Sequence, residues 1–131
     1  MNKTLLTLIL LCFSTIASAD IIWLRTTAFA SANVYRGTYY WSDWERSDMR
    51  ICINTNTDII TIYSPKTQYY GVTAHTKSYV DNQGAKVICF SVIDQDGDRG
   101  QVRLRACADG NSQLYVDFTN VAWVYNVYRT N

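Results

Sequence analysis

The stretch 86-KVICFSVIDQDGDRGQVRLRAC-107 decides the fold class of this chain. Two apolar runs flank a segment rich in aspartate and glycine, which is the pattern of an antiparallel β-hairpin. Side chains on a strand alternate between its two faces, so one face of each run is wholly apolar. The stretch therefore predicts a hairpin with one buried face. The residues of that face are Ile88, Phe90, Val92, Val102, Leu104 and Ala106.

Earlier parts of the chain repeat this kind of pattern. Two runs rich in β-branched residues, within 49–63, flank a polar turn and predict a second hairpin. The segment 34–41 is typical of a strand interrupted by Gly37, where we expect a bulge or a close backbone approach. The run 68–80 is long enough for one bent strand or for two short strands that break at Gly71.

The two ends of the chain differ in clarity. The run 121–128 is apolar or aromatic on both faces, which is typical of a strand covered on both sides. The N-terminal segment 20–33 shows no clear period of apolar residues, so the sequence does not predict its secondary structure. With no helical period elsewhere, the sequence predicts an all-β fold for 34–131, a single small antiparallel β-sandwich or β-barrel of about seven to eight strands.

Residues 1–19 have the features of a secretory signal peptide. A basic start at Lys3 is followed by an apolar stretch over 5–13 and by Ala-Ser-Ala at 17–19. The apolar stretch is shorter than the roughly 20 residues that span a bilayer, and no later segment is long and apolar enough. We therefore expect cleavage near Ala19 and a secreted or periplasmic protein that does not span the membrane.

The charge of the chain argues against two classes of partner. It has 12 lysine and arginine residues against 11 aspartate and glutamate residues, and Lys3 is the only charged side chain in 1–19. Cleavage would leave equal numbers of basic and acidic side chains, and so no net charge with the histidine neutral. Binding to nucleic acid or to an anionic membrane surface needs clustered positive charge, so we expect neither partner.

Three cysteines follow the predicted cleavage site: Cys52, Cys89 and Cys107. An exported protein meets an oxidising compartment, so we expect one disulfide, and the odd cysteine could link two chains in a dimer. Counting outward from the hairpin turn leaves Cys89 and Cys107 about three positions out of register, too far for a bridge. We therefore expect Cys52 to pair with one of them. The spacing of the cysteines does not predict a zinc site.

Asp94, Asp96 and Asp98 are candidate ligands of a metal ion, because closely spaced carboxylates suit calcium. Their pattern departs from a calcium-binding EF-hand loop, in which the glycine follows the third acidic position and a glutamate comes later. Aspartate and glycine are also the residues that tight turns require. We interpret the segment as a plain turn and expect neither a metal ion nor a cofactor.

Aromatic residues supply the candidate binding site. Tyrosines and tryptophans cluster beside the polar loop 42–48, and two more tyrosines lie in a later strand. Both residue types combine apolar area with a hydrogen-bonding tip, so they can bind a sugar ring or a protein partner, although core and edge packing would use them equally well. The candidate residues are Tyr39, Tyr40, Trp41, Trp44, Tyr69 and Tyr70.

No set of residues in the sequence predicts catalysis. His75 is the only histidine, and its spacing indicates no nucleophile and no orienting carboxylate beside it. The sequence therefore predicts a small secreted β-domain that binds an unknown glycan or protein and is not an enzyme. Two alternatives are a secreted hydrolase that uses carboxylates in a cleft and a purely structural envelope protein.

Overall fold

The structure, a computed structural model, describes residues 21–107 and 111–131. The predicted signal peptide and its cleavage site near Ala19 lie outside these residues. None of the described residues forms a helix long and apolar enough to cross a membrane. The strands are β1 (Ile21–Tyr35), β2 (Thr38–Trp41), β3 (Glu45–Arg46), β4 (Arg50–Asn54), β5 (Ile59–Ile62), β6 (Gln68–His75), β7 (Tyr79–Val80), β8 (Lys86–Ile93), β9 (Arg99–Ala106), β10 (Ser112–Asp117) and β11 (Val121–Arg129).

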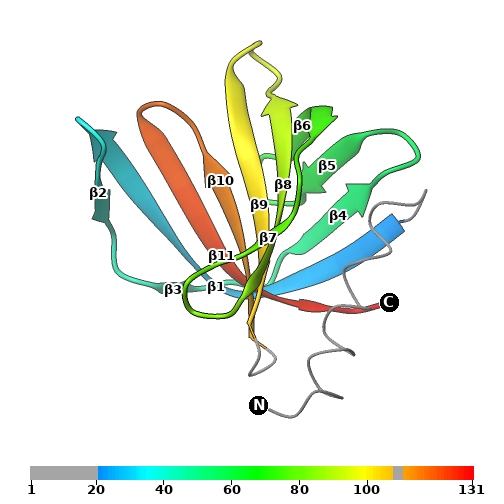
Figure 1. The fold of residues 1–131 in the computed structure, drawn as a ribbon, viewed down its shortest axis with the longest axis horizontal. Helices are drawn as coiled ribbons and strands as arrows, with labels where there is room; N and C mark the ends of the chain where they lie inside the picture. Colours follow the sequence, from blue (N-terminus) through cyan, green and yellow to red (C-terminus); the bar gives the residue numbers. More distant parts are fainter. Residues whose placement is uncertain (1–20, 108–110) are drawn as a thin grey trace.

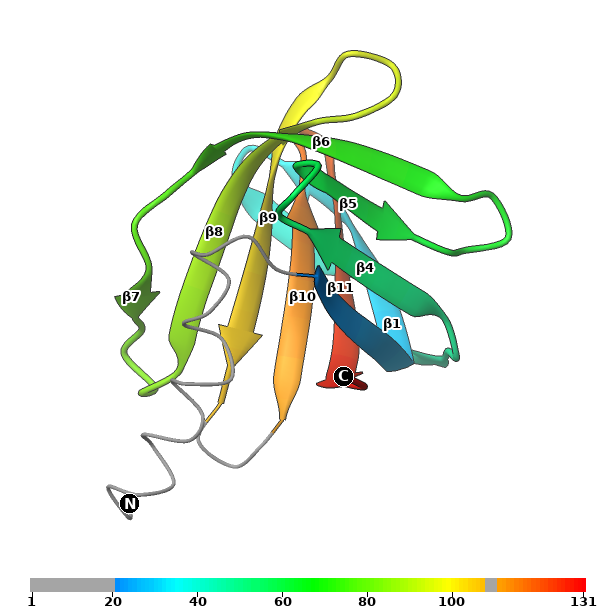
Figure 2. The ribbon, with the colours of Figure 1, turned by 90° about the vertical axis from the view of Figure 1, so that its right-hand side faces the viewer.

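Eight strands close into an antiparallel barrel in the order β1, β4, β5, β6, β8, β9, β10 and β11. The sheet closes because β1 pairs with β4 on one side and with β11 on the other. The remaining strands are additions: β2 and β3 pair with β1, and β7 pairs with β8 (Figures 1 and 2). The predicted all-β fold is confirmed, and the pairing of β1 with β11 makes it a barrel.

The hairpin that the sequence predicts most clearly is formed by β8 and β9. Phe90 lies opposite Val102, and Ile88 lies opposite Leu104, so the two apolar faces meet on one side of the sheet. The second predicted hairpin is formed by β4 and β5. β11 is covered on both faces as expected, since it buries inward and outward side chains alike.

β1, the longest strand, lies in the segment whose structure the sequence left open. Its register against β11 shifts between Thr26 and Ala28, where a β-bulge interrupts the alternation. Before the bulge Leu24 belongs to the core; after it, Phe29 packs against the core and stacks on Tyr125. The bulge therefore explains why this segment shows no single period.

The interruption at Gly37 is a hairpin turn and not the expected bulge. Arg36 and Gly37 both have positive φ, 49° and 78°, as a type I′ turn requires. Tyr35 pairs with Thr38 across the turn, so β1 continues directly into β2. Glycine relieves the strain of the left-handed conformation at the second turn position.

The run 68–80 forms two strands, but the break follows His75 and does not fall at Gly71. Gly71 pairs with Ile59 on β5 and with Ile93 on β8, so it lies well inside β6. A bulge further along β6 shifts its register against β8 before the chain leaves the barrel.

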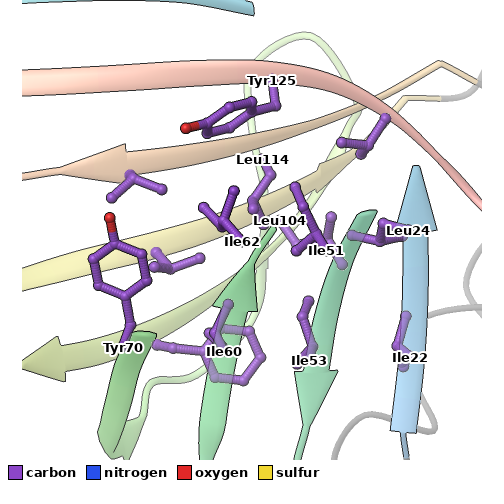
Figure 3. Close-up of a cluster of buried hydrophobic side chains, with 14 of the residues drawn as sticks. Ile22, Leu24, Ile51, Ile53, Ile60, Ile62, Tyr70, Leu104, Leu114 and Tyr125 are labelled. Atoms are coloured by element: carbon purple, nitrogen blue, oxygen red, sulfur yellow. The ribbon is translucent and has the colours of Figure 1, made fainter. Parts of the chain in front are cut away.

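Side chains fill the interior of the barrel, and Figure 3 shows them converging from neighbouring strands. Two tyrosines carry polar atoms into this core. The Tyr70 hydroxyl donates to Gln68 Oε1 at 2.5 Å, and burial raises the pKa of Tyr125 to about 12. The core cluster consists of Ile22, Leu24, Ile51, Ile53, Ile60, Ile62, Tyr70, Phe90, Val92, Val102, Leu104, Ala106, Leu114, Val116, Tyr125 and Val127.

The predicted disulfide is wrong, because the fold keeps the three cysteines apart. Cys52, Cys89 and Cys107 form no disulfide. β5 and β6 separate Cys52 on β4 from Cys89 on β8, which at roughly 4.8 Å per strand is roughly 14 Å. Cys107 follows β9, four strands from β4 in either direction around the barrel. A disulfide spans at most about 7 Å between Cα atoms.

The expectation that Cys89 and Cys107 are out of register is confirmed. Cys89 lies opposite Arg103, so Cys107 is four residues further along the chain. Cys52 and Cys89 are buried and cannot reach a second molecule, whereas Cys107 is partly exposed and its sulfur accepts a hydrogen bond from Arg105. A dimer linked through Cys107 stays a prediction.

Candidate functional site

β2 carries two of the predicted aromatic residues onto the outer face of the barrel. Tyr39 lies opposite Val34, and Trp41 lies opposite Ala32. Directly opposed residues project from the same face of a sheet. Ala32 is three residues beyond the inward-pointing Phe29, so by alternation it faces outward. Tyr39 and Trp41 therefore also lie on the outer face.

One row of residues crosses five strands beneath these rings. Trp41 lies opposite Ala32, which lies opposite Ala122 on β11. Ala122 in turn lies opposite Asp117, and Asp117 lies opposite Gln101. The two alanines face outward but are only 3% and 0% exposed, so larger side chains cover them. Two small residues between Trp41 and Asp117 leave room for the indole to lie over the sheet.

Trp41 is the centre of an aromatic cluster. The Tyr39 ring stacks on it with a centroid distance of 5.8 Å and an interplanar angle of 11°. The Tyr115 ring of β10 meets it edge-on at 6.5 Å. The guanidinium carbon of Arg103 lies 4.4 Å from the Tyr115 centroid, a cation–π contact. Tyr39 and Trp41 remain 44% and 43% exposed, which leaves ring surface for a ligand.

A groove of about 510 Å³ lies beside this cluster. Its volume falls in the range of about 300–1,000 Å³ that is typical of small-molecule sites. Three of its lining residues are aromatic and three are polar, and they come from β2, β7, β9 and β10. They are Tyr39, Trp41, Tyr79, Gln101, Arg103 and Asp117.

The polar side of the groove is built around an ion pair. Arg103 Nε donates to Asp117 Oδ2 at 2.7 Å. Burial disfavours the charge of Arg103, but the hydrogen bond to Asp117 and the charge interactions with Asp117, Tyr79 and Tyr115 together more than offset this, so the pKa of the guanidinium lies above its ordinary value. The other carboxylate oxygen, Asp117 Oδ1, is buried without a hydrogen-bond partner among the described residues.

Of the six predicted binding residues, the structure brings Tyr39 and Trp41 together in this groove and places the others elsewhere. Tyr40 lies on the other face of the hairpin, and Trp44 lies exposed in the connection between β2 and β3. Tyr69 lines a different hollow. Tyr70 is 4% exposed and belongs to the core cluster, so it cannot form part of an exposed aromatic strip.

Sequence reasoning missed the residues that face these two rings. Tyr79, Gln101, Arg103 and Asp117 lie 38 to 76 positions after Trp41 in the chain. Val102 belongs to the predicted buried face, so alternation indicates that its neighbour Arg103 faces outward. This was the signal in the sequence that could have pointed to Arg103. The register that sets Asp117 beside Trp41 depends on the closure of the barrel, which no local pattern shows.

The acidic segment 94–98 forms a hydrogen-bonded turn. Asp94 Oδ1 accepts from the backbone N–H of Asp96 at 2.9 Å and of Asp98 at 2.8 Å. Gly97 has a φ of 87°, the left-handed conformation that glycine adopts most easily. These bonds support the interpretation as a turn. Among the described residues, no group of three or more histidine, cysteine, aspartate or glutamate residues is placed to hold a metal ion.

The hydrolase alternative requires two carboxylates that face each other across a cleft. Four carboxylates lie beside a cation or the histidine in four separate places, whereas Asp94 and Asp98 line one hollow together. His75 Nε2 lies 3.3 Å from Asp58 Oδ1, and both side chains are exposed to solvent. The pairs are Arg25–Asp48, His75–Asp58, Arg103–Asp117 and Arg105–Asp81.

The chain matches no protein-family model, no curated protein and no solved structure. A function must therefore be inferred from the structure itself. The groove offers stacked aromatic rings, a guanidinium group and the carboxylate paired with it.

Proposed function

We propose that this protein is a non-catalytic domain that binds carbohydrate in the groove between Trp41 and Asp117. One observation carries the proposal: exposed, stacked aromatic rings and the polar Arg103–Asp117 pair line the same groove. A sugar ring has an apolar face of C–H groups and a rim of hydroxyls. The aromatic residues bind the face, and the polar residues bind the rim.

The polar groups of the groove suit a neutral saccharide. A sugar hydroxyl donates to the exposed part of the Asp117 carboxylate, whose side chain is 16% exposed, and Arg103 carries further N–H donors on its two terminal nitrogens. The Gln101 amide both donates and accepts. Because Arg103 and Asp117 form an ion pair at 2.7 Å, their charges offset each other in the groove. An acidic sugar would place a second negative charge beside the Asp117 carboxylate.

A protein ligand is the second candidate, and a different surface favours it. Tyr35 and Tyr40 are 62% and 60% exposed on the other face of the β1–β2 hairpin, which extends from the barrel in Figure 1. Exposed tyrosines on a projecting hairpin suit anchors that insert into a partner. The proposal also includes export, which the signal-peptide pattern of residues 1–19 supports.

A saccharide screen tests the proposal. Neutral oligosaccharides are first screened on a glycan array, and those that bind are measured by titration calorimetry. We expect Trp41→Ala to weaken binding about tenfold or more, equivalent to about 1.4 kcal/mol, because the main stacking face is lost. Asp117→Asn should also weaken binding. Trp44→Ala is the matched control, because Trp44 is equally exposed but does not line the groove, and it should leave the affinity unchanged.

Three results would contradict the proposal. The first is that no neutral saccharide binds. The second is that Trp44→Ala reduces affinity as much as Trp41→Ala. The third is that the only ligand found is a protein whose binding is abolished by Tyr40→Ala and untouched by Trp41→Ala. Circular dichroism of each variant shows whether the barrel has kept its fold.

A further inference from the structure

The loops at one end of the barrel enclose a hollow that is separate from the groove. Its volume is about 690 Å³. It lies between the β8–β9 loop, which projects from the barrel in Figure 2, and the β10–β11 loop. A second hollow of about 310 Å³ adjoins it and shares Tyr70, Asp94 and Trp123 with it. The lining residues that matter below are Tyr70, Asp94, Asp98, Arg99, Phe118 and Trp123.

Three aromatic rings face this hollow at different inclinations. The Tyr70 and Phe118 centroids are 6.1 Å apart with the rings tilted by 36°. The Phe118 and Trp123 centroids are 6.4 Å apart with the rings at 80°. Tyr70 is only 4% exposed, so the partly buried Phe118 and Trp123 are the rings that a ligand in the hollow can contact. The backbone holds Phe118 in place, since its N–H donates to the carbonyl oxygen of Val121 at 2.9 Å.

The rim of the hollow is acidic. Asp94 and Asp98 line it with Arg99, and the adjoining hollow adds Asp96 and Lys66, so three carboxylates stand against two cations. The negative charge of this rim also acts on one of the aromatic residues below it. Burial, the neighbouring Tyr125 and the charge of Asp94 together raise the pKa of the Tyr70 hydroxyl above its ordinary value.

We propose that this hollow binds a small organic cation, in particular the quaternary or tertiary ammonium group of a ligand. The face of an aromatic ring attracts a cation electrostatically, and a group whose charge is spread over methyl substituents loses little hydration when it enters. Phe118 and Trp123, which are only partly buried, provide the accessible ring surfaces, and Asp94 and Asp98 provide the compensating charge. The site does not depend on the carbohydrate groove, because the two share no lining residue.

Other charged ligands fit the hollow less well. A calcium ion needs six or more oxygen ligands, whereas Asp94 Oδ1 already accepts two backbone N–H groups. An anion would meet one guanidinium group, that of Arg99, together with two carboxylates. A neutral apolar ligand would fill the aromatic floor but would leave the acidic rim without a partner.

Nuclear magnetic resonance of the ¹⁵N-labelled protein tests this proposal site by site. The chain has four tryptophans, each with one indole N–H signal. Trp123 reports on the hollow and Trp41 on the groove. The probe is choline, and its control is 3,3-dimethylbutan-1-ol, which has nearly the same shape without the charge. We expect choline to shift the Trp123 signal in a saturable way, and the alcohol to bind roughly tenfold more weakly.

Charge variants complete the test. Asp98→Asn should weaken choline binding about two- to fivefold. Asp43→Asn, the same change in the connection between β2 and β3, is the matched control and should have no effect. Both positions are exposed, so both variants should fold. The proposal is overturned if the alcohol binds as well as choline, if choline leaves the Trp123 signal in place, or if calcium displaces choline.

Discussion

Replacing Gly100 with alanine should destabilise the barrel, because Gly100 on β9 packs against the β10–β11 turn. This turn carries Asp117, which lines the groove, and Phe118, which lines the hollow. A Cβ added to Gly100 would lie 2.6 Å from the backbone oxygen of Asp117 and 2.7 Å from the Phe118 ring. Carbon atoms in ordinary contact lie roughly 3.5–4.0 Å apart, so the β10–β11 turn or β9 would have to move by roughly 0.8 Å. One of the two contacts is with backbone, which cannot rotate away as a side chain can.

The expected size of the effect follows from this overlap. Overpacking of a well-filled site costs about 1–3 kcal/mol, which for a domain of this size lowers the melting temperature by roughly 4–12 °C. Urea unfolding followed by circular dichroism measures it. Gly71→Ala is the matched control, because its Cβ would lie 3.5 Å from Ile93, an ordinary contact. The reasoning is refuted if Gly100→Ala unfolds at the same urea concentration as Gly71→Ala.

Two further predictions concern the acidic turn and the buried tyrosines. Gly97→Val should lower the free energy of unfolding by about 1–2 kcal/mol, because φ is 87° there. Asp96→Asn should leave the melting temperature unchanged with or without calcium. A rise in the melting temperature on adding calcium that is lost in Asp96→Asn would contradict this. Burial raises the pKa of Tyr125 from 10.0 to about 12, so the unfolded chain loses this proton first as the pH rises. Between about pH 10 and 12, this group should lower the free energy of unfolding by about 1.4 kcal/mol per pH unit. If the urea midpoint of Tyr125→Phe declines over this range as much as that of the unchanged protein, the prediction is contradicted.

The hairpins could be predicted because their evidence is local. In β8 and β9 the two apolar faces and the turn between them lie within one short stretch, and the period of two is unbroken. β1 could not be predicted in the same way. Its bulge between Thr26 and Ala28 moves the inward positions from even to odd numbers, so no single period fits the whole strand.

The candidate site was only partly predictable for a related reason. The exposed Tyr39 and Trp41 could be found from the sequence, because the consecutive aromatic residues 39–41 point alternately to the two faces of a strand and cannot all be buried on one face. Their polar partners could not. Asp117 is brought beside Trp41 by two intervening strands, and one of these, β11, pairs with β1 across almost the whole length of the chain.

The disulfide prediction failed because it used compartment and composition where topology decides. An oxidising compartment favours disulfides on average, but a bridge needs two Cα atoms within about 7 Å. In a meandering barrel, residues far apart in the order of strands are far apart in space. Cys52 and Cys89 instead behave as small buried residues on the outer face, and burial raises the pKa of the Cys52 thiol.

The size of the barrel explains why both proposed sites lie outside its interior. Eight strands enclose a space just wide enough to be filled by side chains or to hold one small ligand, and here Phe90 and Ile60 are fully buried within it. A ligand must therefore bind on the outer face or at the loops. Asp117 and Phe118 are consecutive at the β10–β11 turn, and Asp117 lines the groove while Phe118 lines the hollow. A change that moves this turn should thus alter both sites, whereas changes at Trp41 or Asp98 should alter only one.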